Sequence, residues 1–415
     1  MKILGIESSC DETGVAIVED GYKLLSNEVA SSMDLHALYG GVVPEIAARS
    51  HLEFMTPAIE NALKNGNLTG NDPWDNIDGI AVTYGAGLGG SLLVGVLTAR
   101  TLAIVKNKPL YAINHVEGHV YANFLTSVGT STPASLQNTE LRDDSLFETV
   151  LRAPLLTHSS NTTIPSVTRS RLVSKQSPTN VKQWKLGNQN YVLPNTQPKF
   201  PLLALIVSGG HTQLVLFYNH FKYKLLGRTQ DDAIGEAFDK VAKIIGLPYP
   251  GGPSIAKAAQ SGENNKYKFP KAKLDSKYNF SFSGVKTAVL RTAQQICGKS
   301  YDFPSHEIPS LLSTQQRNDL AASFEKIAVE TVVEKTITAF KEYSPKSVVI
   351  AGGVAANQEL RKQLSNSLSI EIKYTDPKLC TDNGAMIATL GCFKVMNKQA
   401  KADPYTLDIE PNLSM

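Results

Sequence analysis

The chain has 415 residues, which is long enough for two domains that each bury their own core, and its 42% apolar and 19% charged residues are a normal globular balance. The net charge of +3 permits a nucleic-acid partner without indicating one. No apolar run reaches the ~18 to 20 residues that a membrane-spanning helix needs, the start resembles neither a signal peptide nor a presequence, and the four cysteines form no C-x-x-C pair. We therefore expect a soluble cytoplasmic protein in a reducing compartment.

The first 125 residues alternate between short apolar runs and helical patterns. Residues 3–8, 14–18 and 22–31 are predicted to be three consecutive strands joined by tight turns. A helix is expected to begin at Pro44 and to end near Gly66, because proline suits a first helical turn and glycine commonly follows helix ends. The other expected elements here are strands at 79–84 and 110–114 and helices at 91–105 and 115–125.

The composition changes at residues 126–200, which are rich in Ser, Thr, Asn and Gln and show no sustained periodicity. Such a segment buries too little apolar surface to offset its ordering entropy, so we expect a mobile or loosely packed insertion. Its second half carries several basic residues, among them Arg169 and Lys185. The alternatives are a solubilising linker and an accessory arm that contacts RNA.

Regular elements return at Pro201. Three strands with tight turns are again expected first, at 202–208, 212–218 and 223–228. The following expected helices cover 235–245, 254–261, 283–296, 314–343, 356–368 and 383–396, with strands at 347–351 and 370–374.

The same order of elements thus occurs twice: three strands, then alternating helix and strand. Two such lobes resemble the duplicated ribonuclease-H-like architecture of actin, Hsp70 and sugar kinases, with a cleft between the lobes. We expect an N-terminal lobe at 1–125, the insertion at 126–200, and a C-terminal lobe at 201–383 with a helical insertion at about 247–340. Residues 384–415 are expected to form a last helix, which crosses back to the first lobe, and a tail. Fold alone does not license a function.

Glycine-rich turns stand at the expected ends of strands or starts of helices: Gly85–Gly90, Ser208–Gly210, Pro250–Pro253 and Ala351–Gly353. Glycine lets backbone amides approach a phosphate closely, and a following helix adds its N-terminal partial charge. Each turn by itself is a weak signal, whereas four in corresponding places favour nucleotide binding. None matches the P-loop pattern.

His115 and His119 lie four residues apart on an expected helix and so share one face, which suits a metal ion. The alternative is a pair of ordinary surface histidines. Glu117 lies roughly 200° from each histidine around the helix, badly placed to serve as the base of a zinc peptidase. Asp382, before the last helix, either caps that helix or completes a His-His-Asp site for zinc or iron.

Three further polar groups have both a functional and a plain interpretation. Asp11 and Glu12, at the tip of the first hairpin, either hold a magnesium or potassium ion, orient water or accept a proton, or form a solvated turn. Asp239 either accepts hydrogen bonds from ribose hydroxyls or pairs with Lys243 within its helix. Asn357 either reaches a nucleotide or begins a helix.

The segments Ile6–Gly14, Asn114–His119, Leu205–Thr212, Gly235–Lys240, Tyr249–Pro253, Ser281–Thr287, Ala351–Asn357 and Cys380–Met386 together resemble the TsaD family. These are bacterial-type tRNA threonylcarbamoyladenosine transferases, related to the archaeal and eukaryotic Kae and mitochondrial Qri proteins. The motifs keep the family's order and span nearly the whole chain except 126–200. The sequence Asn-His-Val-Glu-Gly-His at residues 114–119 is similar to the bacterial or organellar branch of the family.

The resemblance implies transfer of a threonylcarbamoyl group from threonylcarbamoyl-AMP to adenosine 37 of tRNAs that read codons beginning with A. It places His115, His119 and Asp382 on the family's metal ligands and Asp11 and Glu12 on an acidic pair linked to activity. The positions that it implies for adenylate binding, which also admit ATP or ADP, are Ile206, Val207, Ser208, Gly209, Gly210, Asp239, Gly252 and Asn357.

The resemblance also implies partners: a TsaC-type enzyme that supplies the donor, a TsaB-like pseudo-paralogue and a TsaE-like ATPase, with a homodimer plausible through the helix at Pro44–Leu63. Two residues depart from the family pattern. Ala86 replaces a usual proline, and Ala256 replaces a second adenylate-side aspartate of many members, which leaves Asp239 as the expected ribose contact. The insertion replaces a short linker between the lobes.

Two other functions compete with this one. A metal-dependent peptidase would use the two histidines, and an actin-like ATPase would bind nucleotide without modifying RNA. Peptidase activity sensitive to EDTA would favour the first, and ATP binding without tRNA-dependent AMP release would favour the second.

Overall fold

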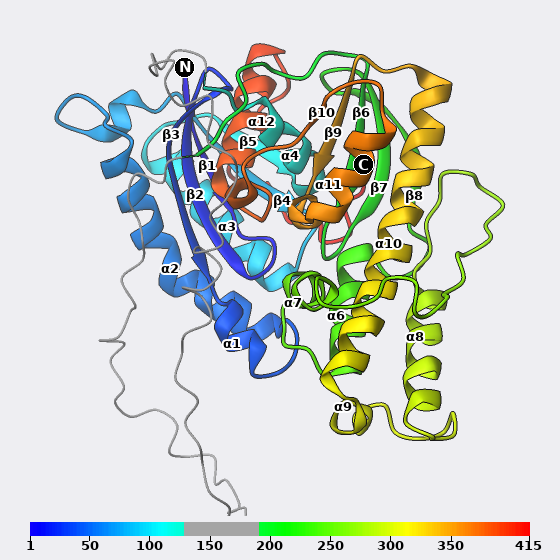
Figure 1. The fold of residues 1–415 in the computed structure, drawn as a ribbon. Coiled ribbons are helices and arrows are strands. Elements are labelled where there is room, and N and C mark those ends of the chain that lie inside the picture. Colours follow the sequence, from blue (N-terminus) through cyan, green and yellow to red (C-terminus); the bar gives the residue numbers. More distant parts are fainter. Residues whose placement is uncertain (128–190) are drawn as a thin grey trace, which may run out of the picture. The chain divides into compact units, whose positions relative to one another are not determined.

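The computed structural model describes residues 1–127 and 191–415, which form the unit considered below (Figure 1). Most of the predicted insertion, residues 128–190, lies outside the described residues, and so do Arg169 and Lys185. The predicted domain boundaries therefore stay predictions. No helix within the described ranges is long and apolar enough to cross a membrane.

The first sheet has five strands in the order β3-β2-β1-β4-β5. β1 pairs antiparallel with β2 and parallel with β4, and β4 pairs parallel with β5. The strand bounds are β1 Lys2–Glu7, β2 Glu12–Glu19, β3 Lys23–Ser31, β4 Gly79–Gly85 and β5 Leu110–Asn114. β1 and β2 read as almost unbroken apolar runs because both of their faces are covered by helices.

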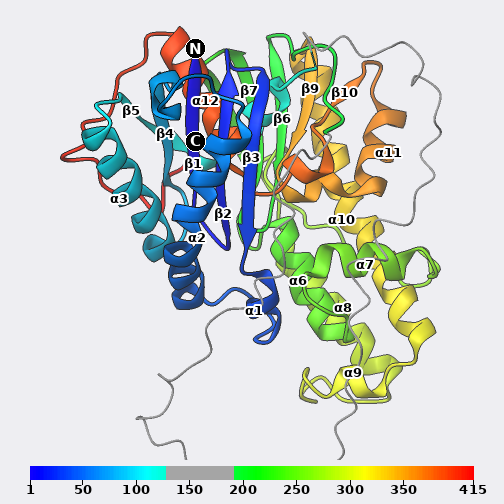
Figure 2. The same ribbon diagram turned by 90° about the vertical axis from the view of Figure 1, so that its left-hand side faces the viewer.

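Alternate residues of β1 and β2 belong to two different cores. Leu4 and Ile6 pack with helix α2 (Pro44–Asn65), whereas Ile3 and Ala16 pack with helix α12 (Gly384–Met396). Helix α3 (Gly89–Val105) lies against β4 and α2 (Figure 2). The last helix of the chain thus covers the sheet formed by its first strands.

The second sheet repeats the first. Its order is β10-β9-β6-β7-β8, so that in both sheets the first strand lies in the centre, flanked by the second and third on one side and the fourth and fifth on the other. The pairing directions also repeat, because β6 is antiparallel to β7 and parallel to β9. This duplicated α/β topology confirms the predicted fold class. The strand bounds are β6 Leu202–Val207, β7 Thr212–Asn219, β8 Lys222–Arg228, β9 Ser347–Ala351 and β10 Ile372–Lys373.

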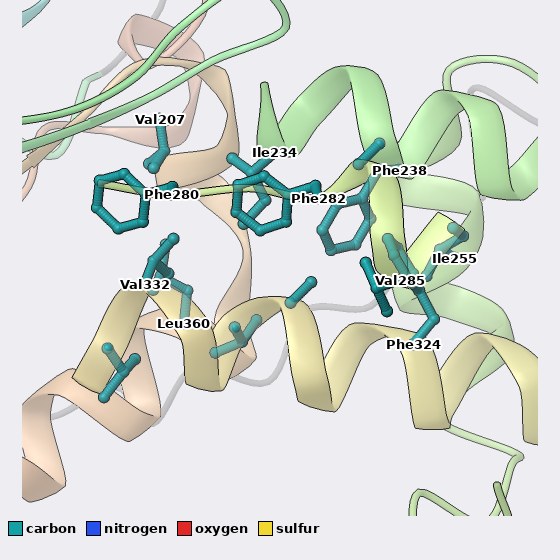
Figure 3. Packing of buried hydrophobic residues seen from close by; sticks show 14 of the residues in the cluster. Val207, Ile234, Phe238, Ile255, Phe280, Phe282, Val285, Phe324, Val332 and Leu360 are labelled. Atoms are coloured by element: carbon teal, nitrogen blue, oxygen red, sulfur yellow. The ribbon is translucent and has the colours of Figure 1, made fainter. Parts of the chain in front are cut away.

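Helices gather beside the second sheet around an aromatic core (Figure 3). Phe238 of α6 meets Phe324 of α10 edge to face, with ring centroids 5.0 Å apart. Phe280 and Phe282 pack in the same core, with Phe238, Phe324 and residues of the sheet. A capping box at Ser313 and Gln316 begins the long helix α10. The bounds are α6 Ile234–Ile245, α7 Gly251–Ala259, α8 Ser283–Ile296, α10 Thr314–Tyr343 and α11 Gln358–Ser367.

The expected elements are present with bounds that shift by a few residues. The helix predicted at 115–125 is shorter than expected: α4 (His115–Tyr121) ends at Tyr121, and the 3-10 turn Ala122–Phe124 follows. Two short helices were not predicted, α1 (Met33–Ala37) and α9 (Ile308–Leu311). Beyond α12 the tail returns to α3, where the Arg100 guanidinium donates to the carbonyls of Pro404, Tyr405 and Leu407.

Candidate metal centre

Helix α4 begins at the C-terminal end of β5, and its start is fixed by Asn114. The Asn114 Oδ1 accepts hydrogen bonds from the amides of Val116 and Glu117, two of the donors that a helix start leaves unpaired. His115 and His119 then project from one face, with ring centroids 4.7 Å apart. Both imidazoles are buried, which excludes the interpretation of an ordinary surface pair.

Asp382 approaches the two histidines from the turn before α12. Its Oδ1 lies 3.6 Å from His115 Nε2 and 3.3 Å from His119 Nε2. One ligand atom from each of the three residues lies within 4.8 Å of the others, which is compact enough for one metal ion. Asp382 is not the cap of α12, because the Asn383 Oδ1 accepts from the Met386 amide in that role. Its carboxylate therefore remains available.

The depth at which α12 packs sets the position of Asp382. A Cβ on Gly384 would stand 2.4 Å from the Ala16 nitrogen, and a Cβ on Gly5 would stand 2.4 Å from both Ala388 N and Gly384 O. Glycine is thus required on both sides of the contact between helix and sheet. The first strands and the last helix can approach only because these side chains are absent.

The electrostatics of His115, His119 and Asp382, called the metal group below, favour a cation. Burial opposes the charge on His115, but Asp382 and Glu7 together raise its pKa to about 9. Burial likewise opposes the charge on Asp382, yet His115 and His119 hold its pKa down to about 2. These side chains therefore stabilise positive charge between the two carboxylates, where a divalent metal would supply it.

The donor set fits zinc or iron, because two imidazoles and a carboxylate leave open positions for substrate. His119 supplies a second observation, since both of its ring nitrogens are buried and make no hydrogen bond with the described residues. Its Nε2 faces the Asp382 carboxylate at 3.3 Å without a hydrogen bond, its Nδ1 makes none either, and buried polar atoms left in this way are costly. A metal on His119 Nε2 would provide one of the missing partners.

Glu7 is part of the site, although its sequence context gave no reason to single it out. It ends β1, it is 0% exposed, and its Oε2 lies 3.2 Å from His115 Nδ1. Ser9 Oγ lies 3.1 Å from the same nitrogen. The one available signal was a carboxylate at the end of an otherwise apolar strand.

The acidic turn of Asp11 and Glu12 lies beside this group. Its backbone is held by buried side chains: His51 Nε2 lies 3.0 Å from the Cys10 carbonyl oxygen, and Ser32 Oγ donates to the Asp11 carbonyl. The carboxylates remain half-buried, and burial together with the charges of Asp11 and Asp382 raises the pKa of Glu12 well above its usual range. The backbone of the turn is therefore anchored, and Glu12 lies close enough to Asp382 to be affected by its charge.

The glycine-rich turns of the second sheet divide into packed and open positions. A Cβ on Gly235 would stand 2.6 Å from the Ser208 carbonyl, and one on Gly352 would stand 2.5 Å from the Val207 carbonyl. By contrast, a Cβ on Gly209, Gly210 or Gly252 would meet nothing within 4 Å among the described residues. The space beside these three Cα atoms is open, which lets a phosphate approach the backbone closely. Ile206 and Val207 are fully buried in β6 and support the turn.

Asp239 and Asn357 have structural partners that the sequence could not reveal. Asp239 Oδ1 accepts from the Gly251 amide at 2.6 Å, so it holds the second glycine turn instead of pairing with Lys243. Asn357 caps α11, since its Oδ1 accepts from Leu360 N, and its Nδ2 donates to Glu325. The unused Asp239 oxygen and one Asn357 N–H are left for a ligand.

The TsaD family model, described as tRNA N6-adenosine threonylcarbamoyltransferase, matches residues 23–137 and 187–389. The chain belongs to the TsaD family. It is 40% identical to the tRNA N6-adenosine threonylcarbamoyltransferase of Thermomicrobium roseum over 100% of this chain and 97% of that one. It is 41% identical to the Dehalococcoides mccartyi protein of the same name over 100% and 99%. These findings confirm the resemblance seen in the sequence.

Solved structures give more distant likenesses. Full-length HypF in its phosphate- and nucleotide-bound form aligns with a TM-score of 0.48 at 11% identity, over 95% of this chain and 46% of that one. The ROK hexokinase of Thermus thermophilus aligns with a TM-score of 0.38 at 12% identity, over 96% and 100%.

Glu117 separates this TsaD member from a zinc peptidase. It is buried, and burial raises its pKa to about 7 even though Lys394 of α12 opposes the shift. The charge of Glu117 also acts on Tyr84 and Tyr223, whereas the ion pairs of His115 and His119 are with Glu7 and Asp382. A peptidase base beside the metal is therefore not supplied by this helix.

His211 is a second residue that sequence reasoning missed. It follows the Gly209–Gly210 turn, and its ring centroid lies 6.3 Å from that of His115. Burial and the two histidines of α4 lower its pKa to about 4. The Ser208–Gly210 turn and the metal group are therefore neighbours, since His211 follows the turn and lies near His115.

Proposed function

We propose that this protein transfers a threonylcarbamoyl group from threonylcarbamoyl-AMP to adenosine 37 of tRNAs that read codons beginning with A, releasing AMP. Membership of the TsaD family supports the tRNA substrate and the group transferred. The observation that carries the site is the convergence of His115, His119 and Asp382 beside an open glycine turn.

We assign the metal to those three side chains, as zinc or iron. When bound, it would supply a Lewis acid that polarises the donor and neutralises charge on the departing phosphate. The His115 and Asp382 atoms that would hold it face each other at 3.6 Å. A magnesium ion at Asp11 and Glu12 is a further proposed ligand of the acidic turn.

The chain's other residues hold the donor and move a proton. The turn Ser208–Gly210 binds the phosphate through the amides of Gly209 and Gly210, because the Ser208 amide already donates to the His211 carbonyl, and Gly252 lines the same space. Asp239 accepts from the ribose hydroxyls, and Asn357 contributes its free N–H. ATP or ADP would occupy the same positions.

In the transfer step the N6 amine of adenosine attacks the carbamoyl carbon, and the bond from that carbon to the phosphate oxygen breaks. AMP leaves with the electron pair, and the amine proton passes to Asp11 or Glu12. The amine is a weak nucleophile, so most of the acceleration comes from fixed geometry and from charge around the leaving phosphate.

Partners are proposed from the family resemblance alone. A TsaC-type enzyme would make the donor, while a TsaB-like pseudo-paralogue and a TsaE-like ATPase would assist transfer in the cytoplasm. The exposed face of α2, which carries Leu52 at 68% exposure, is the proposed place of a homodimer contact. The insertion at 126–200 divides two lobes at 1–125 and 201–383.

The test is nucleoside mass spectrometry of tRNA from cells depleted of their own transferase and supplied with this chain. Restored threonylcarbamoyladenosine with the wild-type chain, and none with Asp382→Ala, is the expected result. ATP hydrolysis without the modified nucleoside would instead support the actin-like ATPase. EDTA-sensitive peptide cleavage would support the peptidase.

A further inference from the structure

Glu7 is a buried carboxylate whose hydrogen bonds converge on the metal group. Its Oε1 accepts from the Ser9 amide at 2.6 Å, and its Oε2 accepts from the Thr83 hydroxyl at 2.5 Å. The same Oε2 lies 3.2 Å from His115 Nδ1. Among the described residues, His115 is its only ion-pair partner.

We infer that Glu7 is a positioning residue that fixes the tautomer of His115 for metal binding. An ionised carboxylate only accepts hydrogen bonds, so His115 Nδ1 must carry the proton that it shares with Glu7. The Nε2 lone pair is then free, and Nε2 is the atom that faces Asp382. This carboxylate–histidine arrangement is one by which proteins orient a metal ligand and raise its basicity. The inference rests on the proposed metal site.

The charges of the group lead to the same conclusion. Glu7 and Asp382 lie on opposite nitrogens of one imidazole, and both Glu7 oxygens accept hydrogen bonds, as an ionised carboxylate does. Their two negative charges balance one divalent cation. A fully buried carboxylate without such compensation would be expensive to maintain.

Ser9 cannot take over this role. Its hydroxyl lies 3.1 Å from His115 Nδ1, but a hydroxyl both donates and accepts, so it does not dictate where the imidazole proton resides. Glu7 also fixes the Ser9 amide, which makes the serine dependent on the carboxylate.

Glu7→Gln tests the inference with almost no change of shape. The glutamine oxygen must face the Ser9 amide, since an NH₂ group there would meet another donor. The NH₂ group is then directed at His115 Nδ1 and Thr83, and the threonine hydroxyl can rotate to accept. His115 Nδ1 would have to accept as well, which moves the proton to Nε2 and blocks the metal.

The measurement is the zinc dissociation constant of the full chain, obtained by competition with a chromophoric chelator, which needs no catalytic activity. Glu7→Gln should weaken binding about 10- to 100-fold. Thr83→Val is the matched control, because it removes a hydrogen bond from the same carboxylate but leaves the acceptor for His115. Thr83→Val should weaken zinc binding by less than tenfold.

Histidine nitrogen NMR of the zinc-loaded wild type gives a second readout that needs no variant. His115 should show a protonated Nδ1 and a metal-bound Nε2, and metal on Nδ1 would overturn the inference even if Glu7→Gln failed to fold. Equal zinc affinity of wild type and Glu7→Gln would refute the role of Glu7 alone. An Asp382→Ala variant that binds zinc like wild type would remove the proposed metal site itself, and the role of Glu7 with it.

Discussion

A methyl group added at Gly5 tests whether the packing of α12 sets the metal group. In Gly5→Ala the new Cβ would stand 2.4 Å from Ala388 N and 2.4 Å from Gly384 O, whereas ordinary contact begins at 3.4 Å. Both obstacles are backbone atoms of α12, so no side-chain rotation relieves them. The helix must retreat by the difference, 3.4 − 2.4, or about 1 Å.

Two separate costs follow from that retreat. Overpacking of this kind destabilises a core by about 1–3 kcal/mol. Asp382 lies two residues before α12 and moves with it, while His115 and His119 stay on α4. Because a 1 Å misplacement at a site can lower a rate about 10²-fold, transfer should fall by about that factor.

The assay combines urea unfolding with single-turnover transfer of threonylcarbamoyl to tRNA at saturating zinc. Gly262→Ala is the matched control, because its Cβ would stand 2.0 Å from the Asn318 carbonyl, a backbone clash of similar severity between the turn after α7 and helix α10. It should lose stability but keep the transfer rate. If Gly5→Ala lost stability and still transferred at the wild-type rate, the depth of α12 would not position Asp382.

Three more substitutions have defined outcomes. Asp382→Ala should abolish transfer while the chain still folds, with a lower unfolding midpoint because His115 and His119 lose their carboxylate partner. Retained transfer after verified loss of metal would contradict the metal mechanism. Burial lowers the pKa of His51, so the imidazole is protonated less readily in the folded chain than in the unfolded chain. The free energy of unfolding should therefore fall as the pH drops below about 6.5, by up to ~1.4 kcal/mol per pH unit. His51→Gln should flatten this pH dependence in urea midpoints measured from pH 5 to 7. Arg100→Leu should speed chymotrypsin cleavage at Tyr405 because it releases the tail, whereas Arg49→Leu, whose exposed ion pair contributes little, should not.

Most regular elements were predictable because their apolar periodicity is long and unambiguous. Strands such as Leu202–Val207 are buried on every residue, and their tight turns bound them clearly. The missed helix Met33–Ala37 is only five residues long and has no side-chain cap, so neither periodicity nor capping marks it. The 3-10 end of α4 depends on packing that no local pattern records.

The site was predictable only in part, for a physical reason. The histidine pair is a local feature, since a spacing of four residues on a helix fixes a shared face. The position of Asp382 was implied by family resemblance, because no spacing relates it to a helix more than 260 residues away. Glu7 and His211 join the site through tertiary contact alone, and their neighbours in sequence are those of an ordinary strand end and turn.

The N-termini of two helices near the metal group explain why two carboxylates, Glu7 and Asp382, are placed there. α4 begins at His115, and α12 begins two residues after Asp382, so the partial positive ends of both helices lie at the group. Alone they would repel a cation, and the carboxylates of Glu7 and Asp382 offset them.

The same helix starts favour an anion beside the metal, so zinc and AMP should strengthen each other's binding. Chelator competition should give a lower zinc dissociation constant when AMP is present, and by reciprocity zinc should tighten AMP to the same degree. Substituting Gly209→Val, which fills the open side of the turn, should weaken AMP and remove this coupling while leaving the zinc affinity of the free protein unchanged. Zinc affinity that is indifferent to AMP in the wild type would show that the phosphate is held away from the metal.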